Sequence, residues 1–275
     1  MLLGYLIGRL KTLSDSAGIS ESDVLYIVEA ILGLSKTEML LQPDYHVAID
    51  DLDTILAAFE RLKDNEPPQY ITGKAPFFNL ELSVAPGVLI PRPETEGLVE
   101  LVLSRIEGAF RVLDVGTGSG AIAIALKSLQ PSLVVDAIDI SQAALNTAKL
   151  NAEASKTDIS FYLGDLFPEN QRMYDVIVSN PPYISAWEMQ QLDARVKDYE
   201  PREALFGGED GLDIYRSLLS EGVKHLNPNG FMALEHGASQ RSDIIEIAQK
   251  CGWGKIKAHE DLQGRDRYLL LSLAR

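Results

Sequence analysis

The sequence predicts an α/β protein preceded by a small helical domain, and three observations lead to that prediction. Residues 1–65 have apolar side chains at helical spacing, whereas strand and helix patterns alternate from residue 91 to residue 252. Such alternation is typical of a mostly parallel sheet with helices on both faces. Two last strand patterns, near 255–260 and 267–273, are so close in the sequence that we expect them to form an antiparallel edge.

Residues 1–65 are expected to form the all-α N-terminal domain. Short segments containing glycine or proline divide it at 18–20, 33–35 and 43–45, and Ser20 is placed to cap the helix that follows it. The domain contains no cluster of residues suited to catalysis. We therefore expect it to recognise a substrate, with a purely structural role as the alternative.

Residues 66–90 are expected to link the two domains through a β-hairpin. Glu66-Pro67-Pro68 ends the helical pattern, and the partly alternating residues 77–84 lead into the turn residues Pro86-Gly87. The third domain, residues 91–275, opens with a helix that has proline and acidic residues in its first turn. Those residues suit a helix N-terminus because they complement the helix dipole.

A glycine-rich segment follows the first strand of the third domain. Residues 110–115 have the pattern of a buried strand and residues 121–126 that of an apolar helix; between them lie Gly116, Thr117, Gly118, Ser119 and Gly120. A strand, a glycine loop and a helix N-terminus together form a common site for nucleotide-like ligands. The spacing also fits the G-x-G-x-x-G/A pattern, so a nicotinamide dinucleotide competes with other ligands for this assignment.

Carboxylates around the glycine loop favour S-adenosylmethionine over a dinucleotide. Asp114 stands two residues before the first glycine, where it would repel the phosphates of a dinucleotide. S-adenosylmethionine has no phosphate, and its ammonium and sulfonium groups tolerate a nearby carboxylate. Asp139, at the end of the next strand, is expected to bind the ribose hydroxyls, and Asp165 with the backbone of Leu166 to contact the adenine edge. Taken singly, each aspartate also fits a cap or a turn.

The tetrapeptide Asn180-Pro181-Pro182-Tyr183 ends another strand pattern, residues 174–179. Neither proline has an N–H group, so the backbone there offers carbonyl oxygens and few donors. The Asn180 side-chain oxygen and a proline carbonyl can accept the two hydrogens of a planar NH₂ group, while the Tyr183 ring packs against its plane. An ordinary strand-to-loop turn fits the same residues. Together with the glycine loop, however, they favour a methyltransferase that acts on an amino or amide nitrogen.

The composition limits the class of substrate and the cellular compartment that we expect. The net charge is −15 without a basic cluster, so no surface suits a run of nucleic-acid phosphates. Cys251 is the only cysteine, which excludes an internal disulfide and fits a reducing compartment. The four histidines lack metal-ligand spacing, and the order of apolar and basic residues at the N-terminus is wrong for a secretory signal. We expect a cytoplasmic protein with no bound metal and no membrane contact.

The chain resembles the peptide chain release factor glutamine methyltransferases of the HemK/PrmC type. The likeness extends over nearly the whole chain and includes, besides the glycine loop, residues 69–73, 89–96, 179–184 and 200–205. It implies a Rossmann-like S-adenosylmethionine-dependent methyltransferase sheet joined to a helical substrate-recognition domain. It also implies methylation of the glutamine side-chain amide in the Gly-Gly-Gln motif of release factors.

The resemblance also assigns roles to individual residues. It implies that Gly116 to Gly120, Asp139, Leu166 and Asn180 contact S-adenosylmethionine, and that Asn180 to Tyr183 contact the glutamine. Leu166 departs from the pattern because some family members carry an aromatic residue there, which puts a stacking contact with adenine in doubt. The expected partner is a release factor, bound by a monomer. A glutamine methyltransferase for a ribosomal protein, a nucleic-acid amino-methyltransferase and a non-catalytic interaction protein remain as alternatives.

Overall fold

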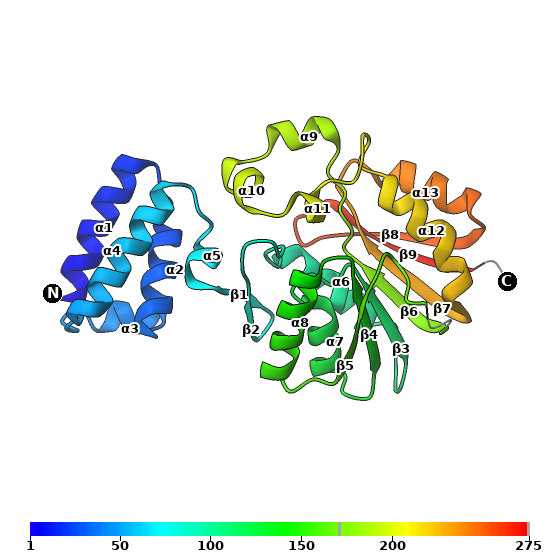
Figure 1. The fold of residues 1–275 in the computed structure, drawn as a ribbon, viewed down its shortest axis with the longest axis horizontal. Helices are drawn as coiled ribbons and strands as arrows, with labels where there is room; N and C mark the ends of the chain where they lie inside the picture. The colour runs from blue at the N-terminus through cyan, green and yellow to red at the C-terminus, as the bar shows by residue number, and fades with distance from the viewer. Residues whose placement is uncertain (170–171, 274–275) are drawn as a thin grey trace. The chain divides into compact units, whose positions relative to one another are not determined.

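The computed structural model describes residues 1–169 and 172–273, and within it the chain forms two compact units (Figure 1). The helical unit consists of Met1–Lys74 together with the distant segment Asp193–Tyr199. The sheet unit consists of Ala75–Leu192 and Glu200–Arg275.

The helical unit is built from amphipathic helices whose apolar faces share one core. Leu3, Leu6 and Leu10 recur at helical spacing and are all buried. Gly18 and Gly33 end two of the helices in the left-handed conformation, which costs glycine little. The helices are α1 (Leu3–Ala17), α2 (Glu21–Leu32), α3 (Lys36–Leu41), α4 (Ile49–Lys63), α5 (Pro68–Thr72) and α10 (Ala194–Tyr199).

Helix α10 is attached to the helical unit by side-chain contacts, although it follows most of the sheet unit in sequence. Arg195 forms an ion pair with Asp23 of α2. The Tyr199 hydroxyl donates a hydrogen bond to the backbone carbonyl of Asp64, at 2.8 Å. The chain therefore leaves the sheet unit after Leu192 and returns to it at Glu200.

The predicted hairpin is present as a two-stranded sheet of β1 (Lys74–Phe77) and β2 (Leu80–Ser83). Phe77 and Leu82 are fully buried and belong to one of the two cores of the sheet unit. The hairpin is thus part of the packed structure that surrounds the large sheet.

The large sheet confirms the predicted fold class. In the described residues it has seven strands in the order β5-β4-β3-β6-β7-β9-β8; β3 to β7 are parallel, and β9 lies antiparallel between β7 and β8. The strands are β3 (Arg111–Val115), β4 (Val134–Asp139), β5 (Ile159–Leu163), β6 (Tyr174–Ser179), β7 (Leu226–Glu235), β8 (Trp253–Glu260) and β9 (Asp266–Leu273).

Helices cover both faces of this sheet (Figure 1). Successive strand residues point to opposite faces, so Val112 belongs to one core and Leu113 to the other. The first core is closed by α6 (Pro93–Leu103), α7 (Ala121–Leu129) and α8 (Gln142–Ala154), and the second by α12 (Asp213–His225) and α13 (Arg241–Lys250). Two short helices, α9 (Ala186–Gln191) and α11 (Arg202–Leu205), lie in the long connection between β6 and α12.

The strand order places a switch point between β3 and β6. From β3 the chain proceeds outward through β4 and β5, and it then returns to add β6 and β7 on the other side of β3. Ligands of open α/β sheets bind outside the carboxyl ends of the strands at such a point. The glycine loop follows β3 and the Asn-Pro-Pro-Tyr segment follows β6, so both begin at this switch point.

Candidate active site

The glycine loop forms an open backbone cradle at the end of β3. Gly116, Gly118 and Gly120 have φ angles of 71°, 57° and 85°, which residues with a Cβ adopt only with strain. A Cβ at Gly116 or Gly118 would meet no atom within 4 Å, whereas one at Gly120 would lie 2.9 Å from Ile124 and 3.2 Å from Ala148. Gly120 is therefore required for packing, while the other two leave the backbone accessible to a ligand.

Asp114 connects the strand, the loop and the following helix from beneath. Its side chain is fully buried, and its Oδ2 accepts hydrogen bonds from the Thr117 hydroxyl at 2.6 Å and from the Ala123 N–H at 3.2 Å. Its Oδ1 has no hydrogen-bond partner among the described residues. Burial raises the pKa of Asp114 to about 7. The carboxyl thus holds the loop in place and keeps one free acceptor oxygen.

Asp139 lies against the glycine loop at the end of β4. Its Oδ2 accepts from the Gly118 N–H and its Oδ1 from the Ser141 N–H, both at 2.8 Å. Burial raises the pKa of Asp139. Ser141 in turn caps α8. The structure therefore brings Asp139 and the glycine loop together.

Asp165 and Leu166 form a tight turn beside Asp139. The Gly164 N–H donates to the Asp139 backbone carbonyl at 3.0 Å, and the Phe167 N–H donates to the Asp165 carbonyl at 2.7 Å. Leu166 has a φ of 57°, an uncommon value for a residue with a side chain of this size. The side chain of Leu166 packs on the core below, so the turn presents its backbone and Asp165 at the carboxyl edge.

The Asn-Pro-Pro-Tyr segment starts next to the end of β3. The Ser179 hydroxyl donates to the Val115 carbonyl at 2.7 Å and so joins the last residues of β6 and β3. Asn180 then donates from Nδ2 to the Thr95 hydroxyl oxygen at 3.0 Å. In the part of the chain that the structure describes, neither Asn180 Oδ1 nor the Pro181 carbonyl accepts a hydrogen bond, so both stay available to a ligand. Tyr183 is half-buried, and burial raises its pKa.

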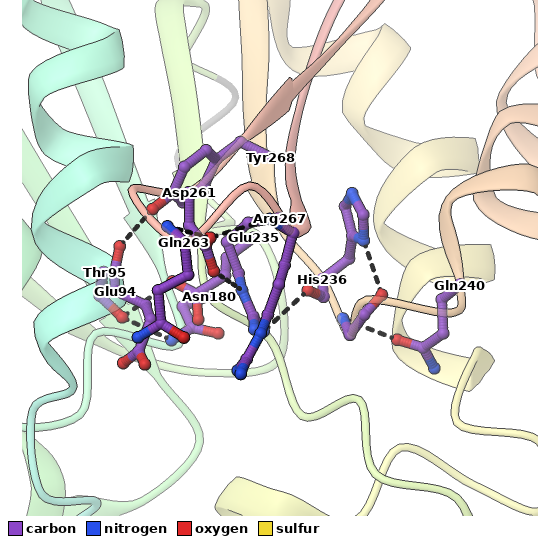
Figure 2. Close-up of polar contacts among 12 residues, drawn as sticks. Glu94, Thr95, Asn180, Glu235, His236, Gln240, Asp261, Gln263, Arg267 and Tyr268 are labelled. Atoms are coloured by element: carbon purple, nitrogen blue, oxygen red, sulfur yellow. Dashed lines mark hydrogen bonds and ion pairs between the residues drawn. The ribbon is translucent and has the colours of Figure 1, made fainter.

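Two residues of this site were not predicted from the sequence: Thr95 and Glu235. Thr95 lies in the first turn of α6, and Glu235 is the last residue of β7. The Thr95 hydroxyl donates to Glu235 Oε2 at 2.8 Å (Figure 2). Glu235 is 1% exposed, and burial raises its pKa to about 7. Its position at the end of a buried apolar strand repeats the pattern that identified Asp139, and that signal was available in the sequence.

An ion pair joins two of the segments that resemble the known family. Arg92 Nη2 lies 2.5 Å from Glu200 Oε1, and Glu200 also accepts from the Ile90 N–H at 3.4 Å. The Glu200 side chain is 2% exposed, so the pair is shielded from water on the carboxylate side. The arginine-proline segment and the late Glu-Pro-Arg segment therefore support each other next to α6.

No group of three or more His, Cys, Asp or Glu side chains within the described ranges is arranged to hold a metal ion. No helix in residues 1–169 and 172–273 is long and apolar enough to span a membrane.

Comparison with known proteins identifies relatives along the whole chain. The family model described as PrmC N-terminal domain matches residues 9–73, and the one described as methyltransferase small domain matches residues 94–195. The release factor glutamine methyltransferase of Lactococcus lactis is 42% identical over 221 residues, 80% of this chain and 82% of that protein. The protein of the same description from Streptococcus pneumoniae is 37% identical over 274 residues, 98% of both chains.

Solved structures share the fold at lower identity. A methyltransferase from Pyrococcus furiosus has a TM-score of 0.55 at 21% identity, covering 81% of this chain and 96% of that one. The T. thermophilus 16S rRNA N2 G1207 methyltransferase in complex with AdoMet and guanosine has a TM-score of 0.54 at 16% identity, covering 73% and 50%. These structures support the methyltransferase-like arrangement of the sheet.

Proposed function

This chain belongs to the release factor glutamine methyltransferase family, and from that premise we propose that it methylates a release-factor glutamine. The methyl group comes from S-adenosylmethionine, and the acceptor is the side-chain amide nitrogen of the glutamine in the Gly-Gly-Gln motif. The observation that carries the proposal is the juxtaposition at the switch point. An open glycine cradle ends β3, and two free acceptor oxygens, Asn180 Oδ1 and the Pro181 carbonyl, follow the neighbouring strand β6.

The residues at the end of β3 fit S-adenosylmethionine. Cβ atoms at Gly116 and Gly118 would project into open space, so the loop backbone is free to approach a ligand. The unpartnered Oδ1 of Asp114 suits a ligand that carries positive charge. We propose that the cofactor is held by Gly116, Thr117, Gly118, Ser119, Gly120, Asp139, Asp165, Leu166 and Asn180. When bound, it supplies an electrophilic methyl group on its sulfonium.

The residues after β6 are suited to activate an amide. An amide nitrogen is a poor nucleophile because its lone pair is delocalised into the carbonyl. If Asn180 Oδ1 and the Pro181 carbonyl each accept one amide hydrogen, they fix the nitrogen in place and stabilise the positive charge that develops on it. Pro182 keeps further N–H donors away, and Tyr183 packs against the amide plane. No strong base is needed because a cationic amide nitrogen loses its proton readily.

We propose that residues 1–65 recognise the release factor, that residues 66–90 link this domain to the catalytic one, and that residues 91–275 carry the chemistry. The protein acts as a monomer on a protein substrate, and the net charge of −15 argues against nucleic acid. A chain that begins at Ala75 tests the recognition role: it keeps Phe77 and Leu82 in the core, although α10 loses its partners in the helical unit. It should still methylate a short Gly-Gly-Gln peptide, while its kcat/KM for intact release factor falls. Equal loss on both substrates would count against separate recognition.

Mass spectrometry of purified release factor tests the reaction itself. The protein is incubated with the factor and S-adenosylmethionine, and the tryptic peptide that contains Gly-Gly-Gln is analysed. One added methyl group on the glutamine is expected. If S-adenosylmethionine binds in calorimetry but no methyl group appears, the assigned substrate is wrong, and ribosomal proteins and then nucleic acids are the next acceptors to assay. If the cofactor does not bind, the catalytic proposal fails as well.

A further inference from the structure

A chain of hydrogen bonds connects Asn180 to a buried carboxylate. Asn180 Nδ2 donates to Thr95 Oγ1 at 3.0 Å, and Thr95 Oγ1 donates to Glu235 Oε2 at 2.8 Å. Figure 2 shows these side chains converging from the end of β6, the first turn of α6 and the end of β7. Thr95 is 5% exposed and Glu235 1% exposed, so water does not replace these contacts easily.

The chemistry of Glu235 sets the direction of this chain. An ionised carboxylate only accepts hydrogen bonds, so the single Thr95 proton must point toward it. The Thr95 oxygen then faces Asn180 with a lone pair and requires a donor there. Asn180 must present its NH₂ group to Thr95, which leaves its carbonyl oxygen on the other side.

That orientation matters because the two ends of an asparagine amide are nearly equal in size and opposite in hydrogen bonding. With Oδ1 toward the acceptor amide, Asn180 accepts a hydrogen from the glutamine nitrogen. After a half-turn of the amide, its NH₂ group would face the NH₂ group of the glutamine, and two donors would meet. Shape alone does not select between these states, so a polar anchor is needed.

We propose that Thr95 and Glu235 are positioning residues that hold the Asn180 amide in the orientation required for methyl transfer. The inference rests on the proposed function, since it assumes that Asn180 meets the acceptor amide. Glu235 acts through Thr95 and does not touch the reacting atoms. Thr95 is in turn held in place by Tyr268, whose hydroxyl donates to the Glu94 carbonyl at 2.6 Å and so holds the first turn of α6.

Protonation of Glu235 would reverse the donor–acceptor direction of the hydrogen bonds that link it through Thr95 to Asn180. A neutral carboxyl can donate to Thr95, which can then donate to a flipped Asn180 carbonyl oxygen. Burial brings the pKa of Glu235 to about 7, so both states are accessible near neutral pH. The charged groups that face Glu235 are Arg92 and Glu94 at the N-terminus of α6 and Arg267 of β9. The neutral hydroxyls of Tyr183, Tyr215 and Tyr268 also face it. The rate should therefore fall as the pH is lowered through the pKa of Glu235.

The kinetic test compares two substitutions with matched controls at saturating S-adenosylmethionine and release factor. Thr95→Val removes the hydroxyl at constant shape and should lower kcat about 10–100-fold, the range expected for a lost hydrogen bond to a charged group. Thr95→Ser should recover most of the rate. Glu235→Gln should lower kcat. It should also remove the fall in kcat at low pH that protonation of Glu235 causes in the wild type. Glu260→Gln is the control for Glu235, because Glu260 ends the nearby strand β8 but is exposed.

The cofactor Kd and the Tm of the variants distinguish a positioning role of Thr95 and Glu235 from a role in folding. We expect the cofactor Kd and the Tm of Glu235→Gln and Thr95→Ser to stay close to those of the wild type. A wild-type kcat and pH profile in Glu235→Gln would overturn the inference while leaving the proposed function intact. Absence of methylation by the wild-type protein would instead refute the proposed function.

Nuclear magnetic resonance tests the inference without any turnover. The Asn180 side-chain NH₂ signal is identified by its loss in Asn180→Ala and followed from pH 5 to 9 in the free protein. It should shift with the titration of Glu235 in the wild type and become insensitive to that titration in Glu235→Gln and Thr95→Val. A signal in the wild type that does not respond to Glu235 would show that the two residues are not coupled.

Discussion

The two halves of the carboxyl edge are built in different ways. In the half that we propose holds the cofactor (the cofactor half), after β3 and β4, hydrogen bonds join residues that are nearer in sequence. Asp114 contacts Thr117 and Ala123, three and nine positions away, and Asp139 contacts Gly118, 21 positions away. In the half that we propose binds the acceptor amide (the acceptor half), after β6 and β7, the partners are remote in sequence. Asn180 and Thr95 are 85 positions apart, and Thr95 and Glu235 are 140 apart. The cofactor half relies on local backbone shape, whereas the acceptor half relies on side chains from separate elements.

This difference predicts how each half responds to change. A backbone cradle tolerates side-chain changes nearby but not an added Cβ, and its loss should show in cofactor affinity. A side-chain network with remote members loses function when one polar atom is removed, and its loss should show in the rate.

Asn180→Ala should reduce kcat about 10²–10³-fold, because it removes one of the two acceptors for the developing charge on the nitrogen. The assay is methylation of release factor at saturating cofactor, with the cofactor Kd measured in parallel. A turnover near that of the wild type would mean that Asn180 Oδ1 does not bind the acceptor amide. A large rise in the cofactor Kd with unchanged kcat would mean that Asn180 binds the cofactor but does not bind the acceptor amide.

Asp114→Asn should change how stability depends on pH. Asp114 has its folded-state pKa raised from 3.8 to about 7, so the folded protein binds more protons than the unfolded chain between these values. Its ionisation therefore lowers the free energy of unfolding as the pH rises from about 4 to about 7. The free energy of unfolding of the variant, relative to that of the wild type, should increase by on the order of 2 kcal/mol from pH 5 to pH 8, as measured by urea denaturation. If the difference in the free energy of unfolding between the variant and the wild type did not vary with pH, the raised pKa of Asp114 would be contradicted.

Gly118→Ala should weaken cofactor binding about tenfold with a smaller effect on kcat, since the added Cβ strains the left-handed backbone and enters the open cradle. Gly87→Ala is a matched control: Gly87 has a φ of 91° with no atom near its Cβ, but it lies in the turn after the hairpin. Both variants should lose similar stability, and only Gly118→Ala should change the Kd. Equal Kd values for the two would contradict the cradle.

The same division explains what the sequence predicts about this protein. Gly116 to Gly120, Asp139 and the strands around them follow from local periodicity and spacing, and the structure brings them together. The antiparallel edge also follows, because 255–260 and 267–273 are close in the sequence. Glu235 ends an apolar strand as Asp139 does, so a local pattern points to it, but its pairing with Thr95, 140 positions away, depends on the sheet order and does not follow from the sequence.

The placement of α10 also required the structure. Residues 194–199 have no pattern that distinguishes a helix of the sheet unit from one that pairs with a distant region. Only the Arg195–Asp23 ion pair and the Tyr199–Asp64 hydrogen bond assign the segment to the helical unit. Packing partners more than 100 positions away are set by tertiary structure, which local pattern does not encode.

The attachment of α10 has a consequence for exchanging domains between relatives. Because the chain returns to the helical unit for residues 193–199 and then re-enters the sheet unit at Glu200, no single crossover point separates the two units. A chimera that takes residues 1–74 from another family member would pair foreign Asp23 and Asp64 positions with the resident Arg195 and Tyr199. A domain exchange that preserves the Arg195–Asp23 and Tyr199–Asp64 contacts must transfer residues 1–74 and 193–199 together. The two units are therefore inherited together more readily than they are exchanged.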